Sequence, residues 1–276
     1  MADRLSALLT HFELRSRVFF SGFHCGVAAF TAEPGVGHLH LLRSGALQVR
    51  DADGAARIID QPSLLLYGQP VAHRLEAPFA EGADLVCAAI EFGIAHGNPL
   101  LGGLPSPFVV PLSMLPQQGR LLDLLFDEAF GAHCGQQAAV NRLIEVLLIH
   151  VLRHGMKTGV VAAGALAGLA DPRLSKALIA LHETPGKGWS LDTLAAQAGM
   201  SRARFAAHFH QIVGVTPGEY LTAWRMSIAL GLLRRGRPVG VVASMVGYGA
   251  TAAFSRAFLH NLGVSPRAWL RAQRAA

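Results

Sequence analysis

The pattern of hydrophobic and polar positions along the chain changes near residue 115. Before that point, short apolar runs such as "VFFSGF" and "PSLLLY" alternate with Gly, Pro and Asp, as is typical of β-strands joined by tight turns. The stretch "ALQVRDADGAARIID" predicts a hairpin that turns at Asp53-Gly54. Strands at this spacing predict a small β-sandwich or β-barrel over the first part of the chain.

After residue 115, apolar residues recur at helical spacing. The stretches "LLDLLFDEAFGAHCG" and "AAVNRLIEVLLIHVLRHG" predict two helices that are separated by a break at Gly135. Two such helices are expected to form an antiparallel pair. The second, residues 138–154, has more apolar surface than one partner helix would cover. A homodimer contact and ordinary packing on the β-structure both explain that surplus.

One stretch near the C-terminus occurs twice. Phe205 to Pro217 reads "FAAHFHQIVGVTP", and Phe254 to Pro266, 49 residues later, reads "FSRAFLHNLGVSP". In each copy two Phe lie four residues apart, on one face of a helix, and a Gly ends that helix. A Thr-Pro or Ser-Pro pair then starts another helix. Each copy also follows a short helix and a glycine, which predicts two helix-turn-helix units in tandem.

The charge is distributed unevenly. Residues 171–276 contain 13 Lys/Arg against 4 Asp/Glu, whereas residues 1–170 contain 11 against 14. A basic half that contains the repeat is typical of a nucleic-acid-binding module, although a solvated basic face would also account for the charge. No apolar run reaches the roughly 18 residues of a membrane span, and the first residues lack a signal-peptide pattern. We expect a cytoplasmic protein.

The repeat region resembles the AraC/XylS family of bacterial transcription regulators. The matching stretches are "LDTLAAQAGMSRARFAAHF", "GVTPGEYLTAWRMSIALGLL", "VGYGATAAFSRAF" and "GVSPRAWL". The resemblance implies that the second helix of each unit enters the major groove of promoter DNA, in two successive turns of the duplex. It also implies RNA polymerase as a partner.

The positions on the solvent side of the two recognition helices are the expected contacts to DNA. Arginines there would bind phosphate or guanine, or remain solvated charges. Alanines would contact thymine methyl groups or give weak specificity at those bases. The expected DNA-binding residues are Arg202, Ala203, Arg204, Ala206, Ala207, His210, Thr251, Ala252, Ser255 and Arg256.

The N-terminal half resembles cupin-type sensor domains through "GHLHLLRSGALQV", "PSLLLYGQPVAHRL" and "ADLVCAAIEFGIAHGNPLLGGLP". His38 and His40 would share one face of a strand. With His73 from a later strand and Cys87 or Cys25 nearby, they would offer the nitrogen and sulfur ligands that zinc or another divalent metal accepts. The acidic ligand that the cupin pattern expects is missing from residues 41–44, however. Structural or effector-contacting histidines are the alternative.

The cysteines suggest a second kind of sensor. Cys25 and Cys87 would form a redox-sensitive disulfide if their strands approach, although two small buried core residues are the simpler interpretation. Cys134, beside Gly135, is expected to be incidental. Three scattered cysteines do not form a secreted disulfide framework.

Together these patterns predict an α+β protein of two domains. Residues 1–155 are expected to form a cupin-like β-barrel with a helical pair, residues 156–172 a linker, and residues 173–276 an all-helical DNA-binding domain. The expected function is a DNA-binding transcription regulator, not an enzyme, that senses a small molecule, a metal or an oxidant. Activation and repression are both compatible with this organisation. The alternative is a metal-dependent cupin enzyme with a basic helical tail.

Overall fold

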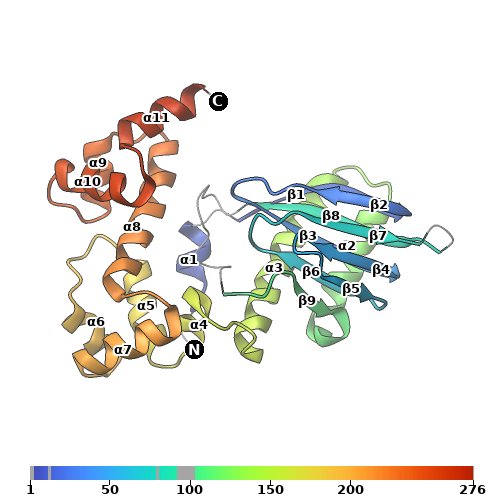
Figure 1. Ribbon diagram of the computed structural model, residues 1–276, viewed down its shortest axis with the longest axis horizontal. Helices are drawn as coiled ribbons and strands as arrows, with labels where there is room; N and C mark the ends of the chain where they lie inside the picture. Colours follow the sequence, from blue (N-terminus) through green and yellow to red (C-terminus); the bar gives the residue numbers. More distant parts are fainter. Residues whose placement is uncertain (1–2, 12–13, 79–80, 92–102, 276) are drawn as a thin grey trace. The chain divides into compact units, whose positions relative to one another are not determined.

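The computed structural model describes residues 3–11, 14–78, 81–91 and 103–275. Part of the third cupin-like stretch, residues 92–102, therefore lies outside the described residues. The chain divides into two compact units, which we call the sandwich unit (Glu13–Ala162) and the helical unit (Met1–Phe12 with Ala163–Ala276). The strands belong to the first unit, and the regular elements described in the second are all helices (Figure 1). This confirms the expected α+β fold.

The sandwich unit contains two antiparallel sheets. Both alternate hydrophobic and polar residues where one face meets solvent, as the sequence pattern predicts. The five-stranded sheet has the order β1 (Arg15–His24), β8 (Ala83–Glu91), β3 (Val36–Gly45), β6 (Ser63–Tyr67) and β9 (Phe108–Pro111). The four-stranded sheet has the order β2 (Gly26–Phe30), β7 (His73–Ala77), β4 (Leu47–Asp51) and β5 (Ala56–Ile59).

The core of this unit lies between the two sheets. Apolar side chains from both inner faces meet there, among them Leu42, Leu65, Leu75 and Cys87. The described strands form two separate sheets, so the expected cupin-like unit is an open sandwich whose sheets do not close into a barrel. Short turns such as Ala52–Ala55 join neighbouring strands within a sheet.

Two helices, α2 (Gly119–Phe130) and α3 (Gln136–Thr158), pack against the five-stranded sheet (Figure 1). The expected break falls at Gly135, which has the left-handed φ of 82° that favours glycine. Short 3-10 turns at Leu112–Met114 and Pro116–Gln118 lead into α2. The apolar stripe of α3 is buried within its own unit, from Val140 to Leu152, so ordinary packing accounts for most of the apolar surplus. A homodimer stays a prediction.

Helix α3 also covers the exposed edge of the five-stranded sheet. The amide of Val18 on the edge strand β1 donates to Asn141 Oδ1 at 2.8 Å, and the amide of Ser16 donates to Glu145 Oε1 at 3.0 Å. Gln137 Nε2 donates to the Val18 carbonyl at 2.7 Å. An uncovered edge strand presents free backbone groups that recruit other strands, so these polar side chains close the sheet on that side.

The helical unit contains two helix-turn-helix units joined by one long helix (Figure 1). The first consists of α6 (Leu191–Gln197) and α7 (Arg202–Val213), and the second of α9 (Val239–Met245) and α10 (Thr251–Leu262). Helix α8 (Pro217–Arg234) connects them. Helix α5 (Leu174–Glu183) precedes the first unit, and α11 (Pro266–Ala275) follows the second. The predicted tandem arrangement is therefore present.

The turns and helix starts are formed mostly by the residues that the sequence indicates. Gly199 and Gly247 have φ of 63° and 84°, which other residues rarely adopt. Thr216 caps α8 in a reciprocal arrangement with Glu219, and Ser265 accepts the amide of Ala268 at the start of α11. Ser201 stands at the start of α7 as expected, but its side chain makes no capping hydrogen bond there.

The expected linker is wrong over most of its length. Residues 164–170 form helix α4 (Gly164–Ala170), whose Leu166 and Leu169 are fully buried in the helical unit. The small residues that suggested flexibility allow close packing instead, since a Cβ on Gly168 would lie only 2.6 Å from Leu178. At the other side, α3 continues to Thr158, so the connection between the two units is short.

The first residues of the chain form a helix that the strand pattern did not predict. Helix α1 (Ser6–His11) belongs to the helical unit, not to the sandwich unit where we placed it. Leu5 and Leu8 are buried, and Arg4 donates to the carbonyls at the end of α4, Leu169 and Ala170, at 3.0 and 3.2 Å. Burial of these leucines favours docking over a free terminus. No helix of the described residues is long and apolar enough to cross a membrane.

The contact between α3 and the edge strand makes a first prediction. Asn141→Leu leaves the Val18 amide without its acceptor, which should cost about 1–3 kcal/mol locally. Amide hydrogen exchange of the full-length protein should show faster exchange at Val18. Lys157→Ala is the matched control, because Lys157 is exposed on the same helix, 16 residues beyond Asn141. Equal exchange rates at Val18 in both variants would contradict this role of Asn141.

Candidate nucleic-acid interface and sensor cavity

Each recognition helix is held from behind by its aromatic pair. Phe205 and Phe209 on α7 are at most 1% exposed, and Phe254 and Phe258 on α10 are fully buried. The two rings of each pair lie 5.6 Å apart between centroids. Because one face is buried against the unit's core, the opposite face of each helix remains in solvent, as the sequence pattern predicts.

The exposed face of α7 consists mainly of small and polar side chains. Ala203, Ala207 and His210 are exposed, whereas Ala206 is half-buried beside the core. Arg202 is exposed and lies 3.7 Å from Asp192 on α6, a surface ion pair that DNA would readily replace. Gln211, one turn beyond Ala207, is also exposed and was not in the predicted set.

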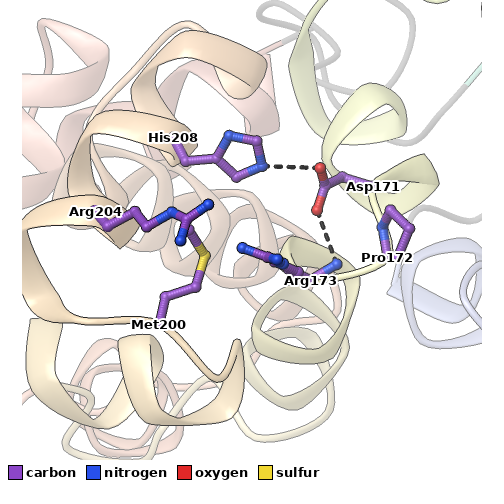
Figure 2. Close-up of a pocket in the computed structure, with 6 residues that line it drawn as sticks. All are labelled: Asp171, Pro172, Arg173, Met200, Arg204 and His208. Carbon is purple, nitrogen blue, oxygen red and sulfur yellow. Dashed lines mark hydrogen bonds and ion pairs between the residues drawn. The ribbon is translucent and has the colours of Figure 1, made fainter.

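Arg204 lies on the flank of α7, next to a small pocket of about 310 Å³ (Figure 2). The Asp171 carboxylate accepts the amides of Arg173 and Leu174 at 2.8 Å through one oxygen. Its other oxygen lies 2.9 Å from His208 Nε2 on α7. These hydrogen bonds hold the pKa of Asp171 below its usual value, although burial opposes them. The start of α5 is thereby tied to the recognition helix.

Helix α10 presents a different face. Thr251 and Ala252 are exposed and Ser255 is half-buried. Arg256 is exposed, and its place two residues after Phe254 and two before Phe258 puts it opposite the buried pair. Leu259, which was not predicted, is 49% exposed on this side of the helix. The second recognition helix therefore has an arginine at the centre of its exposed face, where the first has Ala207.

The sandwich unit brings the three predicted histidines together. His38 and His40 on β3 and His73 on β7 are at most 8% exposed, and the rings of His38 and His40 lie 5.3 and 5.1 Å from that of His73. Phe30 stacks on one face of His73, at 4.8 Å, and Tyr67 is stacked with the same ring, at 3.7 Å. Topology explains the meeting, since β3 and β7 belong to the two facing sheets.

The hydrogen bonds of this cluster determine which nitrogens carry protons. His73 Nδ1 donates to the carbonyl of Val71 at 2.8 Å, so its Nε2 is left to accept from His40 Nε2, also at 2.8 Å. His40 Nδ1 and His38 Nδ1 are buried without a partner among the described residues. Burial lowers the pKa of His38, lowers that of His40 well below the usual value, and lowers that of His73 to about 4. All three are neutral at pH 7.

The cluster does not fit the metal centre that the resemblance implied. His40 and His73 direct their Nε2 atoms at each other, and a metal would require a free lone pair on both. No three His, Cys, Asp or Glu side chains in the described parts of the chain are placed to hold a metal ion. Arg43 does not approach the histidines; it lies 5.0 Å from the ring of Phe130 on α2.

A cavity of about 540 Å³ opens beside His73, at the ends of β2, β4 and β7. Phe30, Asp51 and His73 form part of its wall. Two arginines, Arg50 and Arg74, also line it, and they are directly opposite each other on β4 and β7. Like charges in such a cross-strand pair repel, so an anion between them would be stabilising.

The structure separates the two cysteines of the expected redox pair. Cys87 is 2% exposed and faces the inter-sheet core opposite His40, and burial raises the pKa of its thiol to about 12. Cys25 is exposed. Cys87 is paired with Phe20, five residues before Cys25, which corresponds to roughly 16 Å along a strand. A disulfide needs Cα atoms within about 7 Å, so this pairing is wrong for the fold as it stands.

A helix-turn-helix tandem that follows a β-sandwich unit defines a two-domain protein of the regulator type. Family models agree with this class: a cupin model matches residues 3–157, and a model described as a helix-turn-helix domain matches residues 194–272. The chain belongs to the AraC-type helix-turn-helix transcriptional regulators with an N-terminal cupin domain.

Relatives with curated names support that membership. A putative AraC-like transcription regulator of Streptomyces antibioticus is 44% identical over 46% of this chain and 42% of its own length, so this match spans less than half of that relative. The "RCS-specific HTH-type transcriptional activator RclR" of Escherichia coli is 29% identical over 82% of this chain and 81% of that protein. "HTH-type transcriptional regulator AlkR" of Acinetobacter baylyi is 29% identical over 88% and 84%. These relatives are regulators, which agrees with the expectation that the chain is not an enzyme.

Solved structures give weaker matches. The DNA-binding domain of AdpA in complex with a target DNA is 31% identical, covers 38% of this chain and 96% of that chain, and has a TM-score of 0.37. ToxT from Vibrio cholerae with a bound unsaturated fatty acid is 13% identical, covers 93% and 94%, and has a TM-score of 0.41.

The positions of the cysteines make a second prediction. In the native full-length protein, iodoacetamide should modify Cys25 and Cys134, which are exposed, and should leave Cys87 unmodified, because its thiol is buried and protonated. Peptide mass spectrometry measures the three sites separately. Labelling in denaturant serves as the control, since all three cysteines should then react. Formation of a Cys25–Cys87 disulfide on mild oxidation would overturn this assignment.

Proposed function

We propose that this protein is a sequence-specific DNA-binding transcription regulator, with α7 and α10 as the helices that read two successive major grooves. The observation that carries the proposal is the pair of recognition helices, each buried on an aromatic pair behind and uncovered in front. Family membership and the basic charge of residues 171–276 support it. Gel shifts with fragments of the source genome test it. An absence of salt-sensitive, sequence-selective binding would contradict it.

The exposed positions divide into base contacts and backbone contacts. Arg256, at the centre of its helix face, is the proposed guanine contact, because Arg offers two parallel donors to guanine O6 and N7. Ala203, Ala207 and Ala252 would meet thymine methyl groups or leave the base unread. Arg204, on the flank beside Arg173, is proposed to contact phosphate instead of a base. RNA polymerase remains an expected partner.

The two kinds of arginine make a third prediction. Arg256→Ala should weaken binding to the preferred operator by about 1–3 kcal/mol of binding free energy. It should have little effect on operators in which the guanine that Arg256 contacts has been replaced. Arg204→Ala should weaken binding to all sequences alike, and should reduce the slope of log affinity against log salt by about 1. Fluorescence anisotropy over a salt series measures both effects. Arg142→Ala, in the sandwich unit, is the control. An Arg256→Ala loss that is equal on every operator would exclude base readout.

We further propose that the sandwich unit senses a small organic anion in the cavity beside His73. Arg50 and Arg74 would neutralise the anion, and Phe30 would contact its apolar part. Two observations favour this effector over a metal or an oxidant: no three-ligand group is assembled among the described residues, and Cys25 and Cys87 lie apart. The buried histidine nitrogens that have no partner among the described residues would offer hydrogen bonds to a bound molecule, and the hydrogen bonds of the cluster would then rearrange.

The cavity makes a fourth prediction. A thermal-shift screen of mono- and dicarboxylates should find compounds that raise the unfolding temperature, because a ligand that binds only the folded state stabilises it. Arg74→Ala and Arg50→Ala should abolish the shift, whereas Arg17→Ala, on β1 of the other sheet, should retain it. Neutral amides of the same acids are the ligand controls. Two results would contradict an anion site. One is an equal thermal shift with the acids and with their amides, and the other is an equal shift in Arg74→Ala, Arg50→Ala and Arg17→Ala.

A further inference from the structure

Arg225 makes contacts with both helix-turn-helix units. It lies in the middle of α8, and its Nε and Nη2 donate to the carbonyls of Pro185 and Lys187, each at 2.9 Å. Those carbonyls belong to the loop of residues 184–189, which leads into the first unit. The guanidinium carbon of Arg225 also lies 5.6 Å from the ring centroid of Tyr248, in the turn of the second unit. One side chain therefore connects the two units.

The loop and the turn also approach each other through their backbones. A Cβ on Gly186 would lie 2.8 Å from the Met245 carbonyl oxygen, and a Cβ on Gly247 would lie 2.6 Å from the Gly186 carbonyl oxygen. Real Cβ atoms do not come so close to backbone atoms, so only glycine permits this approach. Gly188, two residues after Gly186, has nothing within 4 Å of the same added atom. The contact is therefore specific to one point of the loop.

The parts that Arg225 joins are themselves held in place. Trp189 Nε1 donates to the Thr184 carbonyl at 2.9 Å, which closes the loop, and Lys187 lies 4.5 Å above the Trp189 ring. On the other side, the Tyr248 ring packs edge-on against Phe254, at 5.6 Å. Phe254 is the buried anchor of the recognition helix α10. The contacts thus run without a break from the loop before α6, through Arg225 and Tyr248, to the second recognition helix.

A helix alone would fix the two units less firmly. The second unit joins α8 through residues 235–238 and packs on that helix through α9, α10 and α11. The contacts of Arg225 and of the loop of residues 184–189 add a connection from the side of the first unit. Two half-sites on DNA differ by roughly 35° and 3.4 Å for each added base pair, so a modest rotation would let a regulator accept a wrong spacing. Arg holds its donors in a rigid planar fork that matches two carbonyls, whereas the ammonium of Lys is a compact charge on a flexible stem without that fixed geometry.

We propose that Arg225 is a positioning residue that locks the two helix-turn-helix units at one separation, and so determines which spacing between two DNA half-sites the protein accepts. The proposal rests on the DNA binding proposed above. Affinity for an operator with the correct spacing is higher because the two units are pre-organised. Affinity for an operator with a wrong spacing is lower because the units do not adjust to it. Arg225 is not itself expected to touch DNA.

The test measures the affinity of the full-length protein on an operator selected from genomic fragments, and on versions with one base pair inserted or removed between the half-sites. The wild type should lose about tenfold or more on either altered spacing. Arg225→Ala should weaken binding on the original spacing and reduce the spacing penalty to about threefold or less. Arg225→Lys should give a similar result, because the bidentate contact is lost.

A pair of glycine variants tests the same lock without touching Arg225. Gly186→Ala forces the loop away from the Met245 carbonyl and should relax the spacing penalty, whereas Gly188→Ala should behave like the wild type. Thr222→Ala, whose hydroxyl bonds within α8 to the Gly218 carbonyl, is the control on the helix itself. If Arg225→Ala does not fold, Gly186→Ala still tests the proposal.

The outcomes separate the lock from the proposed function. Equal weakening on all spacings by Arg225→Ala and Gly186→Ala would show a purely structural role and overturn the proposal. Hydrogen exchange without DNA gives an independent measurement: Arg225→Ala should raise exchange in residues 184–189 and 245–248 while α7 and α10 stay protected. Loss of protection throughout the unit would also overturn it. No DNA binding by any form, with this exchange pattern present, would refute the function and retain the lock.

Discussion

The helical unit depends on the burial of two aromatic side chains behind each recognition helix. A helix that reads DNA must leave one face bare, so its attachment to the protein rests on the opposite face alone. Phe205 and Phe209 supply that attachment on α7, and Phe254 and Phe258 supply it on α10. The neighbouring Tyr220 extends the first cluster, at 5.6 Å from Phe209, and Trp269 extends the second, at 6.4 Å from Phe258. The glycine turns and capped helices orient elements that these rings hold in place.

The chain passes between the two units twice. It leaves the helical unit after α1 and returns at α4, so the helical unit is assembled from both ends of the sequence. Arg4 bonds the carbonyls that end α4, and Asp171, the next residue, bonds His208 on the first recognition helix. Both covalent connections to the sandwich unit therefore lead into elements that are linked by hydrogen bonds to the part of the molecule that would read DNA.

The interior of the sandwich unit contains buried histidine nitrogens that have no hydrogen-bond partner among the described residues. Three neutral imidazoles lie between the sheets, and the fixed tautomers of His40 and His73 leave one nitrogen of His40 without a donor. Buried polar atoms without partners are costly, so proteins keep few of them without a function. Their place beside an arginine-lined cavity joins the two features in one candidate sensing site.

The sequence by itself determined the elements and the faces of the helix-turn-helix pair. Local rules act there: glycine at positive φ, Ser or Thr before a helix, and Phe at helical spacing each leave a direct trace in the residues. Tertiary structure decided what depends on distant contacts. The small residues of α4 suggested a flexible linker, but they form a helix whose leucines are buried. Helix α1 belongs to the helical unit, although the rest of that unit begins only at Ala163 in the sequence. The packing of the two sheets face to face likewise brought His73 to His40. The register of β1 with β8 kept Cys25 from Cys87, because pairing between distant strands is set by the whole sheet.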